Sequence, residues 1–368
     1  MSRTITRRSF TGIALLAGGS VVAACNSDAG SSDSGQTSAA DAETGDSALE
    51  TTTLSIGLSK DPGLASQMIA IDKGFLEEEG FTEIETTSYD AGALAGEALA
   101  AGEINLWGTS TNPPISMRHN GVPIVITGTA ASGWSEKLVV RDDVTLETPE
   151  DLTKIKIGAL TGATDTVIAN LERLNGLDAG SLQTVNLAPA DQMVALAEDE
   201  VQAIMIWNPW PEQFQVQNPG VPVTYYWEQN TSYFPWADGE EMRASHARLL
   251  FCLREDWISQ NPNSAAAMMR ALFNAQAWIS DTANTDEAID IFVKYTEYDK
   301  SLIEAIWGDY TFDPSLDQEY VEDLNAYTDA AVASGAIGDK QDPLSYTYSD
   351  LLADYDPSKV QVEGGWQP

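Results

Sequence analysis

The side chains best suited to chemistry are hydroxyls, indoles and carboxylates that follow predicted strands. Hydroxyls and carboxylates hydrogen-bond a polar solute, and indoles give it rigid walls. The chain has no HExxH, CxxC, GxSxG, GxGxxG or P-loop motif. Its two histidines, His119 and His246, lie in polar stretches that are typical of solvated residues. The sequence therefore favours the binding of a small solute over catalysis, with no cofactor and no metal ion.

The candidate binding residues fall in short loops after these strands. Asp61 and Glu212 could accept hydrogen bonds from a solute amine, and nearby indoles would add a cation–π attraction of about 1 to 2 kcal/mol. Each candidate has a structural alternative, because Ser and Thr also cap turns and Trp also packs in cores. The expected ligand-binding residues are Ser59, Asp61, Gly108, Thr109, Ser110, Trp134, Thr161, Gly162, Thr164, Trp207, Asn208, Trp210 and Glu212.

The loop 161–164 precedes a predicted helix, so its backbone N–H groups could hold an oxyanion such as a sulfonate. Asp165 stands at the head of that helix and would repel an anion. An acid in a first turn is also ordinary helix stabilisation. An amino-sulfonate such as taurine could use this loop for one end and a carboxylate for the other.

These loops belong to alternating strand-like and helix-like segments. Such repeats predict mostly parallel sheets covered by helices, with right-handed crossovers. Strands are expected at 54–58, 83–88, 104–107, 122–127, 137–141, 155–160, 184–187 and 203–207, and helices at 64–79, 93–101, 114–119, 165–175, 189–198, 262–280 and 286–295.

The order of these segments predicts an α/β fold of two lobes. The first lobe is expected to hold residues 51–140 and a return segment, 248–368, and the second lobe residues 141–247. Ligands of open α/β sheets bind at the carboxyl ends of strands, so the cleft between the lobes is the expected site.

Residues 1–24 are predicted to be an export signal. Arg7 and Arg8 resemble a twin-arginine motif, and the apolar run that follows is too short to span a membrane. The small residues before Cys25 resemble a bacterial lipobox, so Cys25 is the expected site of lipidation. Residues 25–50 are poor in large apolar side chains and predict a disordered tether. The protein is thus expected outside the cytoplasm, lipid-anchored to the outer face of the cytoplasmic membrane.

The charge is strongly negative, with 56 acidic against 19 basic residues and a net charge of −37. Such a body repels nucleic acid, so no nucleic-acid partner is expected. The acid excess indicates a salt-adapted source, the alternative being an ordinary acidic secreted protein. Cys252 lies in an apolar run and is expected to be a buried, inert thiol.

Several segments resemble one family of transport proteins. Residues 70–81 read AIDKGFLEEEGF, similar to the "A..kGfF..eGl" segment of substrate-binding proteins of ABC importers for nitrate, sulfonates and taurine. Segments 99–105, 149–158, 207–209 and 251–257 resemble later motifs of that family in the same order. Asn105, where the family commonly has Asp, and Trp107 depart from its pattern.

The resemblance, over about 54–310, implies a type II periplasmic-binding-protein fold and a monomeric receptor that delivers a small-molecule solute to the transmembrane subunits of an ABC permease. In that family the loop matching 161–164 holds an oxyanion, which makes a sulfonate or taurine-like amino-sulfonate the leading solute. Nitrate, a pyrimidine or thiamine precursor and an amine remain open. So do a surface lipoprotein for adhesion or sensing and, less favoured, a pyrimidine-forming enzyme of the same fold.

Overall fold

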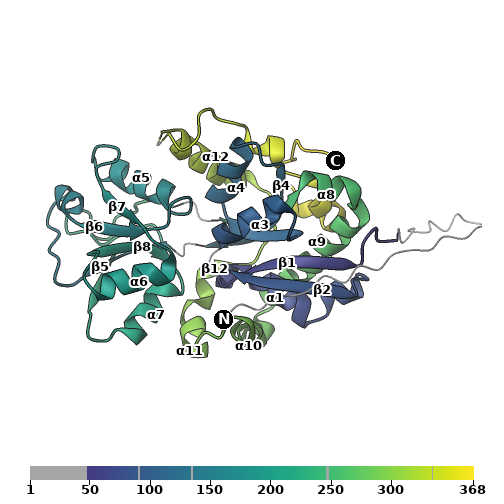
Figure 1. Ribbon diagram of the computed structural model, residues 1–368, viewed down its shortest axis with the longest axis horizontal. Helices are drawn as coiled ribbons and strands as arrows, with labels where there is room; N and C mark the ends of the chain where they lie inside the picture. The colour runs from purple at the N-terminus through teal and green to yellow at the C-terminus, as the bar shows by residue number, and fades with distance from the viewer. Residues whose placement is uncertain (1–47, 90–91, 134–135, 246–247, 334) are drawn as a thin grey trace, which may run out of the picture. The chain divides into compact units, whose positions relative to one another are not determined.

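The computed structural model describes residues 48–89, 92–133, 136–245, 248–333 and 335–368. These residues form two six-stranded sheets flanked by helices (Figure 1). The expected signal, Cys25, most of the expected tether, Trp134 and His246 lie outside the described residues. Residues 48–50, the end of the expected tether, are instead fixed to the body, because Glu50 Oε2 accepts a hydrogen bond from the Ser264 amide at 3.0 Å and Leu49 packs against the core.

The first sheet has the order β12-β4-β11-β3-β1-β2. Four strands joined by helices run in one direction, namely β1 (Thr53–Ser59), β2 (Glu83–Tyr89), β3 (Leu106–Ser110) and β4 (Ile124–Gly133). Strand β11 (Arg248–Arg254) returns from the second sheet and inserts antiparallel between β3 and β4, and β12 (Tyr310–Thr311) pairs antiparallel with β4. The four helix-linked strands are parallel as expected, and the two returning strands make the sheet mixed.

The second sheet has the order β10-β9-β5-β8-β6-β7 and is mixed for the same reason. Strands β6 (Lys156–Ala159), β7 (Gln183–Asn186) and β8 (Ala203–Trp207) are parallel, whereas β5 (Glu136–Arg141) enters from the first sheet and runs antiparallel to β8. Strands β9 (Val223–Glu228) and β10 (Thr231–Ser232), which the sequence did not predict, extend the sheet beyond β5.

Most predicted helices are present. The expected helix 64–79 is broken into α1 (Ala65–Asp72) and α2 (Phe75–Glu78) because Gly74 adopts a left-handed conformation with φ of 78°. The helices beside the second sheet are α5 (Asp165–Leu174), α6 (Pro189–Ala197) and α7 (Trp210–Gln217). The remaining helices lie beside the first sheet and are α3 (Gly96–Ala101), α4 (Asn112–His119), α8 (Glu255–Gln260), α9 (Pro262–Ser280), α10 (Thr285–Thr296), α11 (Lys300–Ile306), α12 (Gln318–Ala333) and α13 (Asp350–Tyr355). No helix in the described part of the chain is both long and apolar enough to span a bilayer.

Each sheet is buried in its own apolar core. Cys252 and Trp107 lie in the core of the first sheet with no exposed surface, and burial raises the pKa of the Cys252 thiol. The expectation of an inert thiol is consistent with this position. Trp227 is likewise buried in the core of the second sheet.

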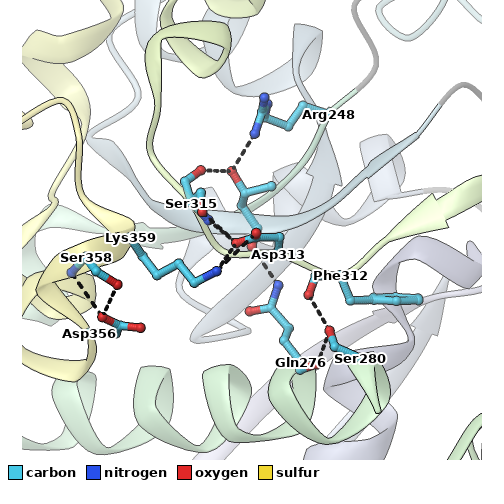
Figure 2. A network of polar contacts seen from close by, with 10 residues as sticks. Arg248, Gln276, Ser280, Phe312, Asp313, Ser315, Asp356, Ser358 and Lys359 are labelled. Carbon is cyan, nitrogen blue, oxygen red and sulfur yellow. Dashed lines mark hydrogen bonds and ion pairs between the residues drawn. The ribbon is translucent and has the colours of Figure 1, made fainter. Parts of the chain in front are cut away.

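Polar contacts fix the C-terminal segment to the first sheet (Figure 2). Gln276 Nε2 on α9 donates to the Thr129 carbonyl of β4 at 2.9 Å, and Ser280 Oγ donates to the Phe312 carbonyl at 2.9 Å. Arg248, the first residue of β11, forms a buried ion pair with Asp323 of α12 at 3.1 Å. These contacts position β12 and the start of β11 beside the carboxyl end of β4.

Candidate functional site

A small cavity lies where the two sheets face each other. Its volume is about 40 Å³ when measured as the space open to the centre of a water molecule. The carboxyl ends of β1, β3 and β4 contribute from the first sheet, and the segment after β6 and the end of β8 from the second. This is where the strand pattern predicts a ligand. The lining residues are Ser59, Asp61, Leu64, Gly92, Thr109, Ser110, Gly133, Glu136, Ala163, Thr164, Trp207, Leu249 and Tyr310.

The structure brings part of the expected set together in this cavity. Ser59, Asp61, Thr109 and Ser110 reach it from the first sheet, and Thr164 and Trp207 from the second. Trp134 lies outside the described residues.

Three expected residues are excluded from the cavity by their packing. Gly108 lies inside β3, where an added Cβ would fall 2.8 Å from Leu64. Trp210 is buried in the second lobe, edge-on to Tyr298. Glu212 forms an ion pair with Lys137 Nζ at 2.5 Å. Lys137 thus neutralises the carboxylate that was expected to bind a solute amine.

Three more expected residues, Thr161, Gly162 and Asn208, make contacts within the protein instead. The Thr161 amide donates to Asn186 Oδ1 at 3.0 Å. The Gly162 carbonyl accepts from Asn112 Nδ2 at 2.6 Å, a bond between the first sheet's α4 and the second lobe. Asn208 Nδ2 donates to Asp309 Oδ2 at 2.8 Å, and Gln229 Nε2 donates to Asp309 Oδ1 at 3.0 Å. These bonds hold the two lobes together beside the cavity.

Every backbone N–H of the loop 161–164 already has an acceptor in the protein. The Gly162 amide donates to Asp165 Oδ2 at 2.9 Å, and the amides of Ala163 and Thr164 both donate to the Leu160 carbonyl at 3.1 Å. The start of α5 is thus occupied by its own carboxylate, Asp165. The loop as it stands has no amide to offer an oxyanion, contrary to the expectation from the sequence.

Two carboxyl groups face the cavity from opposite lobes, because β5 belongs to the second sheet and residues 136–140 therefore lie in the second lobe and not in the first as expected. Asp61 begins the short 3-10 helix Pro62–Leu64, and its Oδ1 accepts from the Gly63 amide at 2.9 Å. Glu136, the first residue of β5, accepts from Ser245 Oγ at 3.0 Å. Burial raises the pKa of each carboxyl to about 7, and the negative charge of Asp61 also raises the pKa of Glu136. Among the described residues that line the cavity there is no Lys, Arg or His.

Two hydroxyls in the cavity lack partners. Ser59 Oγ and Thr109 Oγ1 are buried, with residue exposures of 2% and 0%, and neither hydrogen-bonds to any described residue. A buried hydroxyl without a partner is costly, so these two groups are suited to bonding a bound molecule.

The model of the NMT1-like family matches residues 47–293, which is most of the chain. The chain belongs to the NMT1-like family.

Relatives of this NMT1-like chain are binding proteins. The nitrate/nitrite binding protein NrtA of Nostoc sp. is 25% identical over 265 residues, 66% of this chain and 57% of that protein, so the match spans little more than half of that relative. The crystal structure of the periplasmic nitrate-binding protein NrtA from Synechocystis superposes with a TM-score of 0.69 at 20% identity, over 84% of this chain and 90% of that one. The alkanesulfonate-binding protein SsuA of Xanthomonas axonopodis, bound to MOPS, gives 0.67 at 18% identity, over 82% and 100%. The predicted two-lobed periplasmic-binding-protein fold and the predicted family are confirmed.

The sequence did not predict two of the residues that line the cavity, Glu136 and Tyr310. The register of β5 against β8 places Glu136 opposite Trp207, which identifies the same face of the sheet once the pairing is known. Tyr310 lies on a two-residue strand that pairs with Gly133, far away in sequence. No local pattern marks either residue.

Proposed function

We propose that this protein is an extracytoplasmic solute receptor that captures a small polar organic solute between its lobes and delivers it to an ABC permease. The observation that carries the proposal is the cavity itself, because both sheets contribute polar groups to it and two of its buried hydroxyls have no described protein partner. A solute that contacts both lobes stabilises their closed arrangement by its differential affinity, and no catalytic step is needed. The nitrate- and sulfonate-binding relatives support the same role.

The N-terminal signals complete the proposal. Twin-arginine export would carry the folded protein across the membrane, and lipidation of Cys25 would hold it near the permease. Replacing Cys25 with Ser is expected to release the protein from the membrane fraction into the medium. Retention of the variant in the membrane fraction would contradict lipid anchoring at this residue.

The receptor role is tested by thermal melting in a panel of sulfonates, inorganic anions, amines and pyrimidines. A solute at 100 times its dissociation constant stabilises the folded state by about 2.7 kcal/mol, or about 4 °C for a body of roughly 320 residues. One chemical class is expected to raise the melting temperature by this amount. The double variant Ser59→Ala, Thr109→Ala is expected to lose most of the response, because it removes both unpartnered hydroxyls. A flat response to the whole panel would favour a surface lipoprotein for adhesion.

A further inference from the structure

We propose that the captured solute is a small organic cation, such as a protonated amine, amidine or guanidinium, held between Asp61 of the first lobe and Glu136 of the second. This inference rests on the proposed receptor function and specifies its substrate class. It is carried by two independent observations. The first is that the carboxyls of Asp61 and Glu136 line one cavity, and the second is that the buried hydroxyls of Ser59 and Thr109 face the same cavity without a described partner.

The two carboxyls are negatively charged groups on one small cavity when both are ionised. Asp61 is buried and Glu136 is half-buried, and neither has a basic partner among the described residues that line the cavity. The negative charge of Asp61 also acts on Glu136. A cation between them would neutralise both groups at once. Because one carboxyl belongs to each lobe, the cation would also join the lobes, which is the requirement for closure by ligand.

The surroundings of the cavity do not suit an anion. The amides of the loop 161–164 are all bonded within the protein, and Asp165 adds a further carboxylate at that loop. Lys137, the next residue after Glu136, lies on the opposite face of β5 and is engaged by Glu212 at 2.5 Å and Glu228 at 3.3 Å. Its positive charge is therefore already matched by two carboxylates.

The remaining lining fits a compact, flat cation. The Trp207 and Tyr310 side chains provide aromatic surface, which attracts cations, and the hydroxyls of Ser59 and Thr109 can accept hydrogen bonds from N–H groups. The small size of the cavity suits a compact solute.

Guanidinium, urea and nitrate provide a matched test, because all three are flat species of four heavy atoms with charges of +1, 0 and −1. Melting of the whole protein is measured at pH 8 with millimolar amounts of each, and with ammonium, methylammonium and acetamidinium as further cations. At least one cation is expected to raise the melting temperature by several degrees, whereas urea and nitrate leave it unchanged. The apparent affinity for that cation is expected to fall at least tenfold in Asp61→Asn and in Glu136→Gln. The exposed Asp238→Asn and Glu240→Gln, which change the net charge equally, are expected to respond as the unaltered protein does.

The outcomes separate this inference from the receptor function. A response to nitrate or a sulfonate but to no cation would overturn the cation assignment and leave the receptor role standing. A response to no solute would overturn both. A cation response that persists unchanged in Asp61→Asn and Glu136→Gln would also overturn the inference, because the site would then lie elsewhere. Melting of the ligand-free variants shows separately that they fold.

Discussion

Replacing Asp61 with Asn is expected to make the ligand-free protein more stable while it removes solute binding. The Asn side chain keeps an oxygen for the Gly63 amide but carries no charge. In the unaltered protein the folded-state pKa of Asp61 is about 7, raised mainly by burial from an ordinary value of 3.8. Because the folded state holds this proton more tightly than the unfolded state, the group costs stability as the pH rises from about 4 to 7, and the full cost remains above pH 7.

The size of the effect follows from the two pKa values. One pKa unit corresponds to about 1.4 kcal/mol, so the raised pKa of Asp61 costs about 4 kcal/mol at pH 8, where the folded-state carboxyl is ionised. At pH 5 the folded-state carboxyl is protonated, and the cost is about 2 kcal/mol because the unfolded chain releases the proton. For a body of roughly 320 residues the unfolding entropy is about 0.7 kcal/mol/K, and the Asn variant should melt about 6 °C higher at pH 8 and about 3 °C higher at pH 5.

Differential scanning calorimetry of both proteins without solute, at pH 5 and pH 8, measures this difference. Comparing the variant with the unaltered protein at each pH cancels the contributions of the other carboxyls. The exposed Asp238→Asn serves as the control and should not change the melting temperature by more than about 1 °C. An Asn variant that melts below the unaltered protein at pH 8, or a gain that is the same at both pH values, would refute the assignment of a buried, charge-strained Asp61.

Four further predictions follow from the site and the charge. Lowering the pH from 8 to 6 should weaken the binding of a cationic solute by on the order of 100-fold, because both carboxyls must be ionised to bind it. Titration calorimetry measures this change, and equal or tighter binding at pH 6 would exclude the coupling. Trp207→Ala should weaken solute binding at least tenfold with a modest change in ligand-free melting, and a collapse of the fold instead would assign this indole to the core. Asp309 does not line the cavity, but Asp309→Ala removes the acceptor of the hydrogen bonds from Asn208 and Gln229. This variant should release the solute several-fold faster in stopped-flow experiments, and an unchanged rate would mean that these bonds do not hold the lobes closed. Raising NaCl from about 0.1 to 2 M should raise the melting temperature of the ligand-free protein by screening its charge of −37, and a decrease would contradict salt adaptation.

The sequence predicts the parts of this structure that depend on local patterns. Apolar alternation located β1, β3 and β8, and the rule for carboxyl ends of strands then placed Ser59, Thr109 and Trp207 near the cavity. The mixed sheets were not predicted, because the direction of β11 depends on the path of the chain through the second lobe.

The errors in the site have the same origin in long-range pairing. Glu212 was predicted to meet a solute because it follows β8 closely, yet α7 carries it to the face where Lys137 lies. Glu136 faces the cavity because its register partner is Trp207. Neighbouring residues of one strand point to opposite faces, so the choice between Glu136 and Lys137 depends on a pairing that no single segment encodes.

A crystal structure grown at pH 8 with the cation that gives the largest thermal response tests the central claim most directly. The solute is expected between the two sheets, with its charged nitrogen within hydrogen-bond distance of both Asp61 and Glu136. Finding it bound on the outer surface, or finding an anion in the cavity in its place, would contradict the account.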